Sequence, residues 1–297
     1  RLAGILYNLS RQRNRCKLIH TFHGTVLEGY FGKAKTRFFI WIERMLAHFT
    51  HRIIAVSKTL KDELLKLKIG TPEKICVIYL GLELEKLLSL VPQNSNSKLR
   101  VGIVSRLVHI KNQRLFLDTI KFLLKNYNLS PASLRFFIIG DGELRQELEK
   151  YASSLGINEF VEFCGWNSDT AKIYDSLDIV VLTSLNEGTP VSLIEAMAAS
   201  KPIIATDVGG VRDLFTKSQN YGLAATDRIS IYDNGILCRS NDVEGVAEAL
   251  NLLFNHSNLK TNMGDAGRNF VREIFFKERL IKDMEMLYNN LSKRRSS

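Results

Sequence analysis

The sequence lacks the features that mark membrane-spanning, secreted or zinc-binding proteins. No apolar run approaches the roughly 18 residues that a membrane-spanning helix requires. Residues 1–5 do not form a signal peptide. The few cysteines have no paired spacing, which argues against a disulfide framework and a zinc site: Cys16, Cys76, Cys164 and Cys238. Together these absences favour a folded protein of the reducing cytoplasm.

Length and composition fit an ordinary folded chain of more than one domain. The 297 residues correspond to about two domains of roughly 150 residues each. The chain is 45% hydrophobic and 24% charged, as globular proteins are. It begins with Arg1 rather than Met, so we expect a preceding part to be missing.

Acidic residues are scarce in the first fifth of the chain. Residues 1–60 hold eleven Lys or Arg against two Glu, a net charge of +9. Within them, residues 36–52 are predicted to form a helix that is rich in apolar side chains with Lys and Arg at its flanks. One interpretation is a surface for an anionic lipid or an anionic acceptor. The favoured one is a helix packed under a sheet with a solvated basic edge. The sequence contains no basic motif interleaved with aromatic residues, so it does not indicate a nucleic-acid partner.

Strand-like and helix-like runs alternate along the chain, which predicts an α/β fold with parallel sheets. A polar break at residues 92–97 divides it into domains 1–92 and 93–275, and a closing helix 276–297 is expected to pack toward the first domain. Six strands are expected in the second domain. The segment 215–234 is long for a connection, and is either a mobile flap or a small hairpin. The predicted strands are 17–22, 52–56, 74–79, 99–104, 135–139, 161–164, 179–182, 202–206 and 235–238.

The most informative feature is a pair of glutamates eight positions apart, Glu187 and Glu195. They follow the apolar run 179–182, which predicts a buried strand. Thr189 and Pro190 then predict a helix cap and a first helical residue. Such a helix directs free N–H groups and its positive dipole end toward the loop, where a diphosphate can bind.

Cations follow an earlier predicted strand. Arg106 comes directly after residues 99–104, and Lys111 lies five residues later. Arg can bind two phosphate oxygens at once, and Lys acts as a point charge. Ligands of open α/β sheets bind at the carboxyl ends of the strands, which favours a binding site over a chance surface pair.

Four other groups of residues are weaker signals. The turn 140–142 lacks the third glycine of a dinucleotide fingerprint, because Arg145 occupies that place. Asp141 and Glu143 fit a helix-opening turn better than a metal-binding carboxylate pair. His23 ends the first predicted strand, where it could hydrogen-bond a sugar or a phosphate. His48 and His51 are interpreted as surface residues rather than metal ligands.

The order of these motifs resembles the retaining glycosyltransferases of family four. The likeness rests on segments 105–107, 111–112 and 140–142, on the two glutamates, and on segments 195–198 and 208–211. It extends into the first domain through His23-Gly24 and segment 55–57. The resemblance implies the GT-B fold, with two facing Rossmann-like domains, the donor held mainly by the second and the acceptor by the first. Nothing before Leu18 matches the family, so the first domain is expected to be incomplete.

The resemblance also implies a role for each matching residue. Arg106 and Lys111 would hold the donor diphosphate, and Glu195 would bind the ribose hydroxyls. Glu187 would face the donor sugar, and His23 would reach it from the first domain. The backbone of the turn before the helix would line the sugar and the phosphates: Gly188, Thr189, Pro190 and Val191. The base would lie near Gly142, Gly165 and Trp166.

These expectations define a metal-independent, retaining glycosyltransferase without a cofactor. It would move a sugar from a nucleoside diphosphate, with uridine as the base, to a hydroxyl of a glycan or a lipid-linked acceptor. It would work in the cytoplasm, with the inner face of the membrane as a further expectation through the basic first domain. Two alternatives stay open: a non-catalytic module that binds a nucleotide sugar, and a nucleotide-sugar epimerase.

Overall fold

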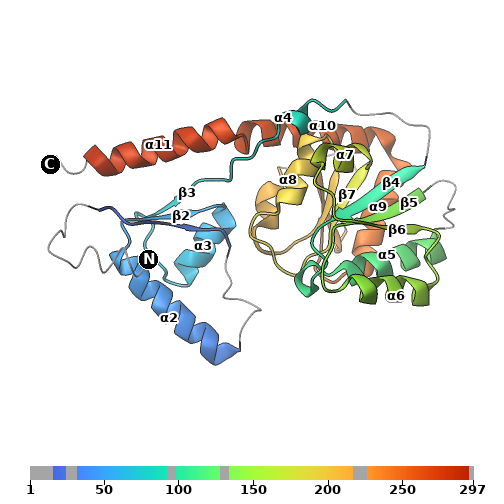
Figure 1. Cartoon of the computed structure of the whole chain (residues 1–297), viewed down its shortest axis with the longest axis horizontal. Helices are drawn as coiled ribbons and strands as arrows, with labels where there is room; N and C mark the ends of the chain where they lie inside the picture. The colour runs from blue at the N-terminus through green and yellow to red at the C-terminus, as the bar shows by residue number, and fades with distance from the viewer. Residues whose placement is uncertain (1–15, 25–31, 92–97, 128–133, 217–225, 294–297) are drawn as a thin grey trace. The chain divides into compact units, whose positions relative to one another are not determined.

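A computed structural model describes residues 16–24, 32–91, 98–127, 134–216 and 226–293. The chain forms two compact units (Figure 1). Unit 1 contains residues 1–82 and 275–297, and unit 2 contains residues 83–274. The polar break predicted at 92–97 lies outside the described residues.

Unit 1 contains a parallel sheet with the order β1-β2-β3. Its core consists of apolar side chains from the strands and from helices α2 and α3, such as Ala47, Ile53 and Leu64. The last helix belongs to this unit, where Arg279 donates hydrogen bonds to the backbone oxygens of Tyr79 and Leu80 at 2.7 and 2.8 Å. The elements are β1 (Ile19–Phe22), α2 (Lys33–Phe49), β2 (Arg52–Ala55), α3 (Lys58–Lys66), β3 (Ile75–Val77) and α11 (Lys277–Lys293).

Helix α2 differs from its predicted form in its bounds and in its packing. It begins before residue 36, and it ends at Phe49 because Thr50 has an extended backbone that leads into β2. Leu46 and Ala47 are buried, but Phe38 and Trp41 are 58% and 57% exposed. The helix therefore packs on the sheet and has a solvated basic edge as predicted, but large apolar side chains also lie in solvent, which was not predicted. Among the described residues, no helix is long and apolar enough to cross a bilayer.

Unit 2 contains a seven-stranded sheet with the order β6-β5-β4-β7-β8-β10-β9. All pairs are parallel except β10 with β9. Its strands are β4 (Leu99–Val104), β5 (Leu134–Ile139), β6 (Val161–Gly165), β7 (Ile179–Leu182), β8 (Ile203–Thr206), β9 (Ile229–Tyr232) and β10 (Gly235–Cys238). Its helices are α4 (Glu85–Leu88), η1 (His109–Lys111), α5 (Gln113–Asn126), α6 (Arg145–Leu155), α7 (Thr170–Asp175), α8 (Val191–Ala198), η2 (Gly209–Leu214), α9 (Val243–Asn255) and α10 (Ser257–Ile274).

Helices cover both faces of the seven-stranded sheet (Figure 1). Helices α5, α6 and α9 pack together, as do α7, α8 and α10. Apolar strands and helix faces meet in a core where Phe116 and Phe136 pack edge to face, 5.7 Å between ring centroids. Strand β7 is apolar throughout, and β4 is apolar except for Arg100, because helices cover both faces of the sheet.

The segment 215–234, predicted as a mobile flap or a small hairpin, contributes a strand to the sheet. Strand β9 pairs antiparallel with β10, so the second sheet has seven described strands rather than six. The described end of the segment thus forms a hairpin, and residues 217–225 lie outside the described residues. Buried Asn234 sits in the turn and donates to the backbone oxygen of Leu214 at 2.7 Å.

The strand order places a topological switch at the centre of the unit 2 sheet. From β4, the chain builds outward through β5 and β6, and then returns to the other side of β4 to place β7 and β8. Strands β4 and β7 are neighbours, but the loop after β4 leads toward the β5 side of the sheet and the loop after β7 leads toward the β8 side. Ligands of open α/β sheets bind at such a switch point, outside the carboxyl ends of the strands.

Candidate functional site

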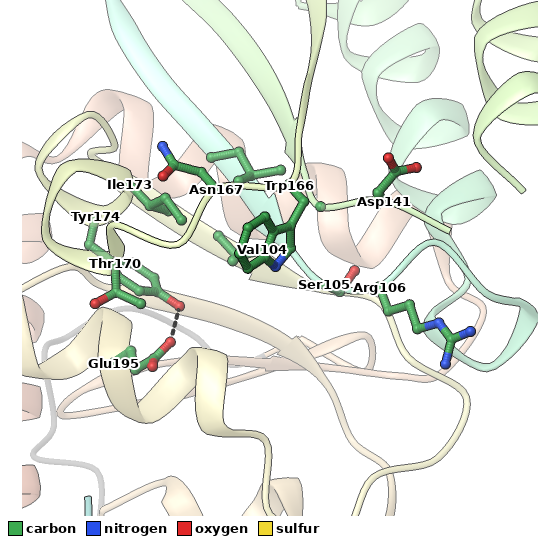
Figure 2. A pocket seen from close by; sticks show the side chains of 12 residues that line it. Val104, Ser105, Arg106, Asp141, Trp166, Asn167, Thr170, Ile173, Tyr174 and Glu195 are labelled. Carbon is green, nitrogen blue, oxygen red and sulfur yellow. Dashed lines mark hydrogen bonds between the residues drawn. The ribbon is translucent and has the colours of Figure 1, made fainter. Parts of the chain in front are cut away.

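A cavity of about 430 Å³ lies at the carboxyl edge of this sheet. Figure 2 shows Tyr174 and Glu195 at one end, Asp141 and Arg106 at the other, and Trp166 between them. The other side chains and backbone that line it belong to Val104, Ser105, Ile139, Gly140, Asn167, Thr170 and Ile173. The cavity thus combines an exposed indole, a cation and a carboxylate.

Successive elements of the fold supply these groups. Arg106 follows β4, Asp141 follows β5 and Trp166 follows β6, while Glu195 lies on α8. Because β4, β5 and β6 are adjacent and parallel, their carboxyl ends deliver these residues to one edge. Trp166 is 74% exposed, so its ring is open to a planar ligand.

Glycine is required where the loops after β4 and β5 meet. Gly140 has φ +136°, and a Cβ there would collide with the backbone oxygen of Ser105. A Cβ on Gly142 would collide with the backbone of Leu107. Gly142 and Gly165, both expected beside a base, are neighbours of lining residues, and Gly165 accepts a hydrogen bond from the Gly140 N–H at 2.9 Å. These glycines let the strand ends approach each other, and Gly140 itself lines the cavity.

Glu195 is held by a buried tyrosine. The Tyr174 hydroxyl, which is 2.8 Å from Glu195 Oε2 and 3.0 Å from the backbone oxygen of Ser192, can donate its one proton to either acceptor. Burial raises the pKa of Glu195, and the hydrogen bond from Tyr174 partly opposes this rise. Burial and the nearby Glu195 carboxyl raise the pKa of Tyr174 as well, which keeps its hydroxyl protonated. The pair presents a fixed hydrogen-bond acceptor to the cavity.

The other glutamate forms an ion pair beside this cavity. Glu187 Oε1 lies 2.5 Å from Lys111 Nζ and accepts a hydrogen bond from the Ser184 hydroxyl at 2.6 Å. The two side chains are only 10% and 25% exposed, so solvent screens the pair weakly. Lys111 does not line the cavity itself, but it shares the loop after β4 with Arg106.

Backbone contacts join the loops after β4 and β7. The Leu185 N–H donates to the Ile110 oxygen at 2.8 Å, and the Thr183 hydroxyl lies 3.0 Å from the Asn112 oxygen. Gly210 N–H donates to the Glu187 oxygen at 3.0 Å. The ion pair is therefore built on loops whose backbones are fixed to one another.

The start of α8 differs from its predicted form. Pro190 has an extended ψ of 106° and occupies the cap position, so that Val191 is the first helical residue. Thr189 does not cap the helix, because it lies one residue too early. Its Oγ1 is buried and, among the described residues, has no hydrogen-bond partner. A buried hydroxyl without a partner beside free helical N–H groups suits a ligand oxygen.

The remaining predicted groups take these positions. His23 is exposed directly after β1 in unit 1. Asp141 accepts a hydrogen bond from Gly142 N–H at 2.8 Å and borders the cavity, in the turn that opens α6. His51 Nδ1 accepts a hydrogen bond from Leu18 N–H at 3.0 Å, and burial and nearby lysines lower the pKa of His51. Across the described residues, no three His, Cys, Asp or Glu side chains are grouped as metal ligands.

The structure brings most of the predicted site of unit 2 together. Arg106, Trp166 and Glu195 line one cavity, and Lys111 pairs with Glu187 on the adjoining loops. Tyr174 was missed, because its partner Glu195 lies 21 residues away and nothing in the local sequence indicates the contact. Ser105, Asn167, Thr170 and Ile173 were not predicted to line the site either; Ser105 could have been found from its place beside Arg106.

Comparison with known proteins gives the family. The profile described as glycosyl transferases group 1 matches residues 91–270, and that of Glycosyltransferase Family 4 matches residues 2–86. The expectation that nothing before Leu18 matches the family is therefore wrong. The chain is 28% identical over 76% of its length to the Escherichia coli UDP-Gal:alpha-D-GlcNAc-diphosphoundecaprenol alpha-1,3-galactosyltransferase. It is 25% identical over 67% of its length to the Staphylococcus aureus poly(ribitol-phosphate) alpha-N-acetylglucosaminyltransferase. The chain spans 60% and 37% of these two relatives.

Solved structures agree with this family in fold. Anabaena HepE in complex with UDP and glucose has a TM-score of 0.74 at 19% identity, covering 97% of this chain and 75% of that one. Sucrose-phosphate synthase from Thermosynechococcus elongatus has a TM-score of 0.78 at 18% identity, covering 99% and 72%. The fold is thus α/β of the GT-B type, with Rossmann-like domains and parallel sheets. Since a single family profile covers well over half of its residues, this chain belongs to the glycosyl transferases group 1 family.

Proposed function

We propose that this protein is a retaining, metal-independent glycosyltransferase. It moves a sugar from a nucleoside diphosphate sugar, with uridine as the base, to a hydroxyl of a glycan or a lipid-linked saccharide. The observation that carries the proposal is the cavity at the switch point, where Arg106 and Glu195 face one opening beside the Lys111–Glu187 pair.

Each part of a nucleotide sugar has a matching group in unit 2. Trp166 offers an exposed ring to the base, and the Glu195 carboxylate accepts hydrogen bonds from the ribose hydroxyls. Arg106, Lys111 and the N–H groups that open α8 surround the diphosphate, with the Thr189 hydroxyl as a further donor. These fixed positive groups stabilise the charge that develops on the leaving diphosphate, which is the role a divalent ion would otherwise have.

The reaction exchanges one bond at the anomeric carbon for another. The bond from that carbon to the diphosphate oxygen breaks, and a bond to the acceptor oxygen forms on the same face. The acceptor proton passes to the departing phosphate oxygen, so that the products are a glycoside and a nucleoside diphosphate. Glu187 is proposed to bind the sugar hydroxyls, and His23 of unit 1 to contact the sugar.

The choice of uridine and of the acceptor class rests on the relatives. HepE has been solved with UDP and glucose, and the Escherichia coli relative is named for a UDP-galactose donor and a diphosphoundecaprenol-linked acceptor. The Staphylococcus aureus relative is named for a poly(ribitol-phosphate) acceptor. Two of these names thus contain UDP or a UDP-sugar, and two contain an acceptor, which is lipid-linked in one and a polymer in the other.

The proposed activity is tested by donor turnover. Purified protein is incubated with a panel of UDP-sugars, with and without glycan and lipid-linked acceptors, and nucleotide release and the anomeric configuration of the product are measured. We expect acceptor-dependent release of UDP, a retained configuration and full activity in excess EDTA. Nucleotide binding without turnover, conversion of the donor without an acceptor, or loss of activity with the chelator would each contradict the proposal.

Replacing Lys111 by Ala is expected to weaken binding of UDP while leaving uridine binding unchanged. Lys111 supplies a positive charge to the diphosphate and nothing to the base or ribose. Loss of one charge-assisted contact corresponds to about 10- to 100-fold in Kd. The measurement is titration calorimetry with UDP and with uridine.

Lys125→Ala is the matched control for this experiment, because Lys125 is exposed on helix α5 of the same unit. It should bind both ligands as the unaltered protein does. An equal loss for UDP and uridine in Lys111→Ala would show that Lys111 only holds the loop in place.

A further inference from the structure

Helix α2 has two apolar sides, and only one of them packs on unit 1. Ala47 is 1% exposed and belongs to the core, with Ile40 packed against it. The second side is formed by four large side chains: Phe38 at 58% exposure, Trp41 at 57%, Met45 at 41% and Phe49 at 45%. We call these four residues the α2 stripe. The rings of Phe38 and Trp41 stack on each other, 6.4 Å between centroids.

The α2 stripe faces away from the sheet. At about 100° per residue, its four positions fall within about 80° of one another, and Ala47 and Ile40 lie about 145–165° from its centre. Another helix in the same layer of the fold would contact the flanks of α2, not the side opposite the core. A partner for the stripe must therefore come from outside this layer.

Basic side chains border the stripe on both sides. Arg37 and Arg44 lie along one border and Lys35 along the other, about 75–105° from its centre. All three are exposed. The one acidic residue of the helix, Glu43, lies on the side that faces the core. A stripe of aromatic and apolar groups between two basic borders matches the interface of an anionic bilayer, where rings enter the headgroup region and cations stay at its surface.

The size of the stripe argues against a stable protein partner. Four side chains of this kind, about half exposed, offer roughly 300–400 Å² of apolar surface. A specific protein interface buries about 800 Å² on each partner. An interfacial helix needs no such area, because lipid encloses each inserted side chain and anionic headgroups add attraction to every nearby cation.

We propose that the α2 stripe is a docking surface for an anionic phospholipid bilayer. Phe38, Trp41, Met45 and Phe49 enter the headgroup region, and the basic borders contact the lipid phosphates. The proposal does not depend on the donor site, since every residue it uses belongs to unit 1.

The test is vesicle flotation of the whole chain. We expect binding to phosphatidylcholine vesicles that contain about 30% phosphatidylglycerol and little binding to phosphatidylcholine alone, with weakening between about 0.1 and 0.5 M salt. The double variant Phe38→Ser, Trp41→Ser should bind the anionic vesicles at least about 10-fold more weakly. The control variant Ile281→Ser, Met286→Ser, which alters residues on α11 of the same unit that are 56% and 49% exposed, should bind normally.

Fluorescence gives a second readout. Trp41 and Trp166 are the two tryptophans, so a Trp166→Phe background reports on Trp41 alone. Its emission should shift to the blue on anionic vesicles. The proposal is overturned if the unaltered protein ignores anionic vesicles, or if the Phe38, Trp41 variant and the α11 control bind them equally. The proposal is also overturned if the unaltered protein is a dimer in analytical ultracentrifugation and the Phe38→Ser, Trp41→Ser variant is a monomer. That result would show that a second copy of the chain covers the α2 stripe.

Discussion

Replacing Glu195 by Gln is expected to weaken UDP binding about 10- to 100-fold and, at neutral pH, to make the free protein more resistant to unfolding. Under the proposed function, binding falls because an amide accepts hydrogen bonds from the ribose less strongly than a carboxylate does. The change keeps the size of the side chain and an acceptor for Tyr174, so the cavity is preserved. Titration calorimetry and urea denaturation measure the two effects.

The stability effect follows from the raised pKa of Glu195. Because burial raises the pKa in the folded state, the unfolded chain loses this proton first as the pH rises. Folding stability therefore falls between the unfolded and the folded pKa, and the full penalty is present above that window, at neutral pH. The glutamine variant should lack this decline. UDP affinity of the unaltered protein should change in the opposite direction and decrease as the pH falls through the folded pKa.

Two comparisons make the result specific. Glu162→Gln changes an exposed carboxylate of the same unit that pairs with Arg135 at 3.3 Å, and it should leave UDP binding unchanged. Tyr174→Phe removes the hydroxyl that opposes the rise in the pKa of Glu195, so its UDP affinity should decline at higher pH than in the unaltered protein. If Glu195→Gln binds UDP with full affinity, Glu195 is not part of the nucleotide site.

Replacing Gly209 by Ala is expected to destabilise the protein by roughly 2–5 kcal/mol. Gly209 has φ +49°, and an added Cβ would collide with the backbone oxygen of Glu187. The loop must shift to accept the methyl group, and this shift displaces the carboxylate that holds Lys111. Under the proposed function, kcat/KM should fall by about 10²-fold. Urea denaturation and donor turnover are the measurements.

Gly156→Ala is the matched control for the collision. Gly156 also has a left-handed backbone, φ +67°, but nothing lies within 4 Å of an added Cβ. The free energy of unfolding of this variant should fall by only about 1–2 kcal/mol, the cost of a left-handed backbone for alanine, and its activity should be unchanged. Equal losses in the two variants would mean that the Glu187 loop moves aside freely and that Gly209 has no positioning role.

Most strands of unit 2 could be predicted from the sequence. Runs 99–104, 179–182 and 235–238 predict β4, β7 and β10 with the bounds that the structure has, because strands covered on both faces are predominantly apolar, with Arg100 as the exception in β4. Strand β9 escaped prediction because only alternate residues, Ile229 and Ile231, are buried, and four residues are too few to display a period. The loops after β4 and β7, and with them Arg106 and Glu187, follow from the strands that precede them.

The hydrogen-bond partners of side chains could not be predicted from the sequence. Nothing around Tyr174 predicts its hydrogen bond to Glu195, because the contact depends on how α7 packs on α8. The cap predicted at Thr189 was wrong by one residue, since the extended backbone of Pro190 delays the helix. The packing of α2 was predicted only in part: one side packs on the sheet as expected, but the apolar residues on the opposite side are exposed, because only one side of a helix can face a sheet.

Under the proposed function, the ion pair between Lys111 and Glu187 makes Glu187 compete with the donor diphosphate for Lys111. A phosphate oxygen must take Lys111 from Glu187, so part of the attraction is used to separate the pair. The separated carboxylate then regains hydrogen-bonding capacity next to the loop where the sugar is proposed to bind. Arrival of the diphosphate would thereby prepare sugar recognition, whereas a bare nucleoside would leave the glutamate occupied.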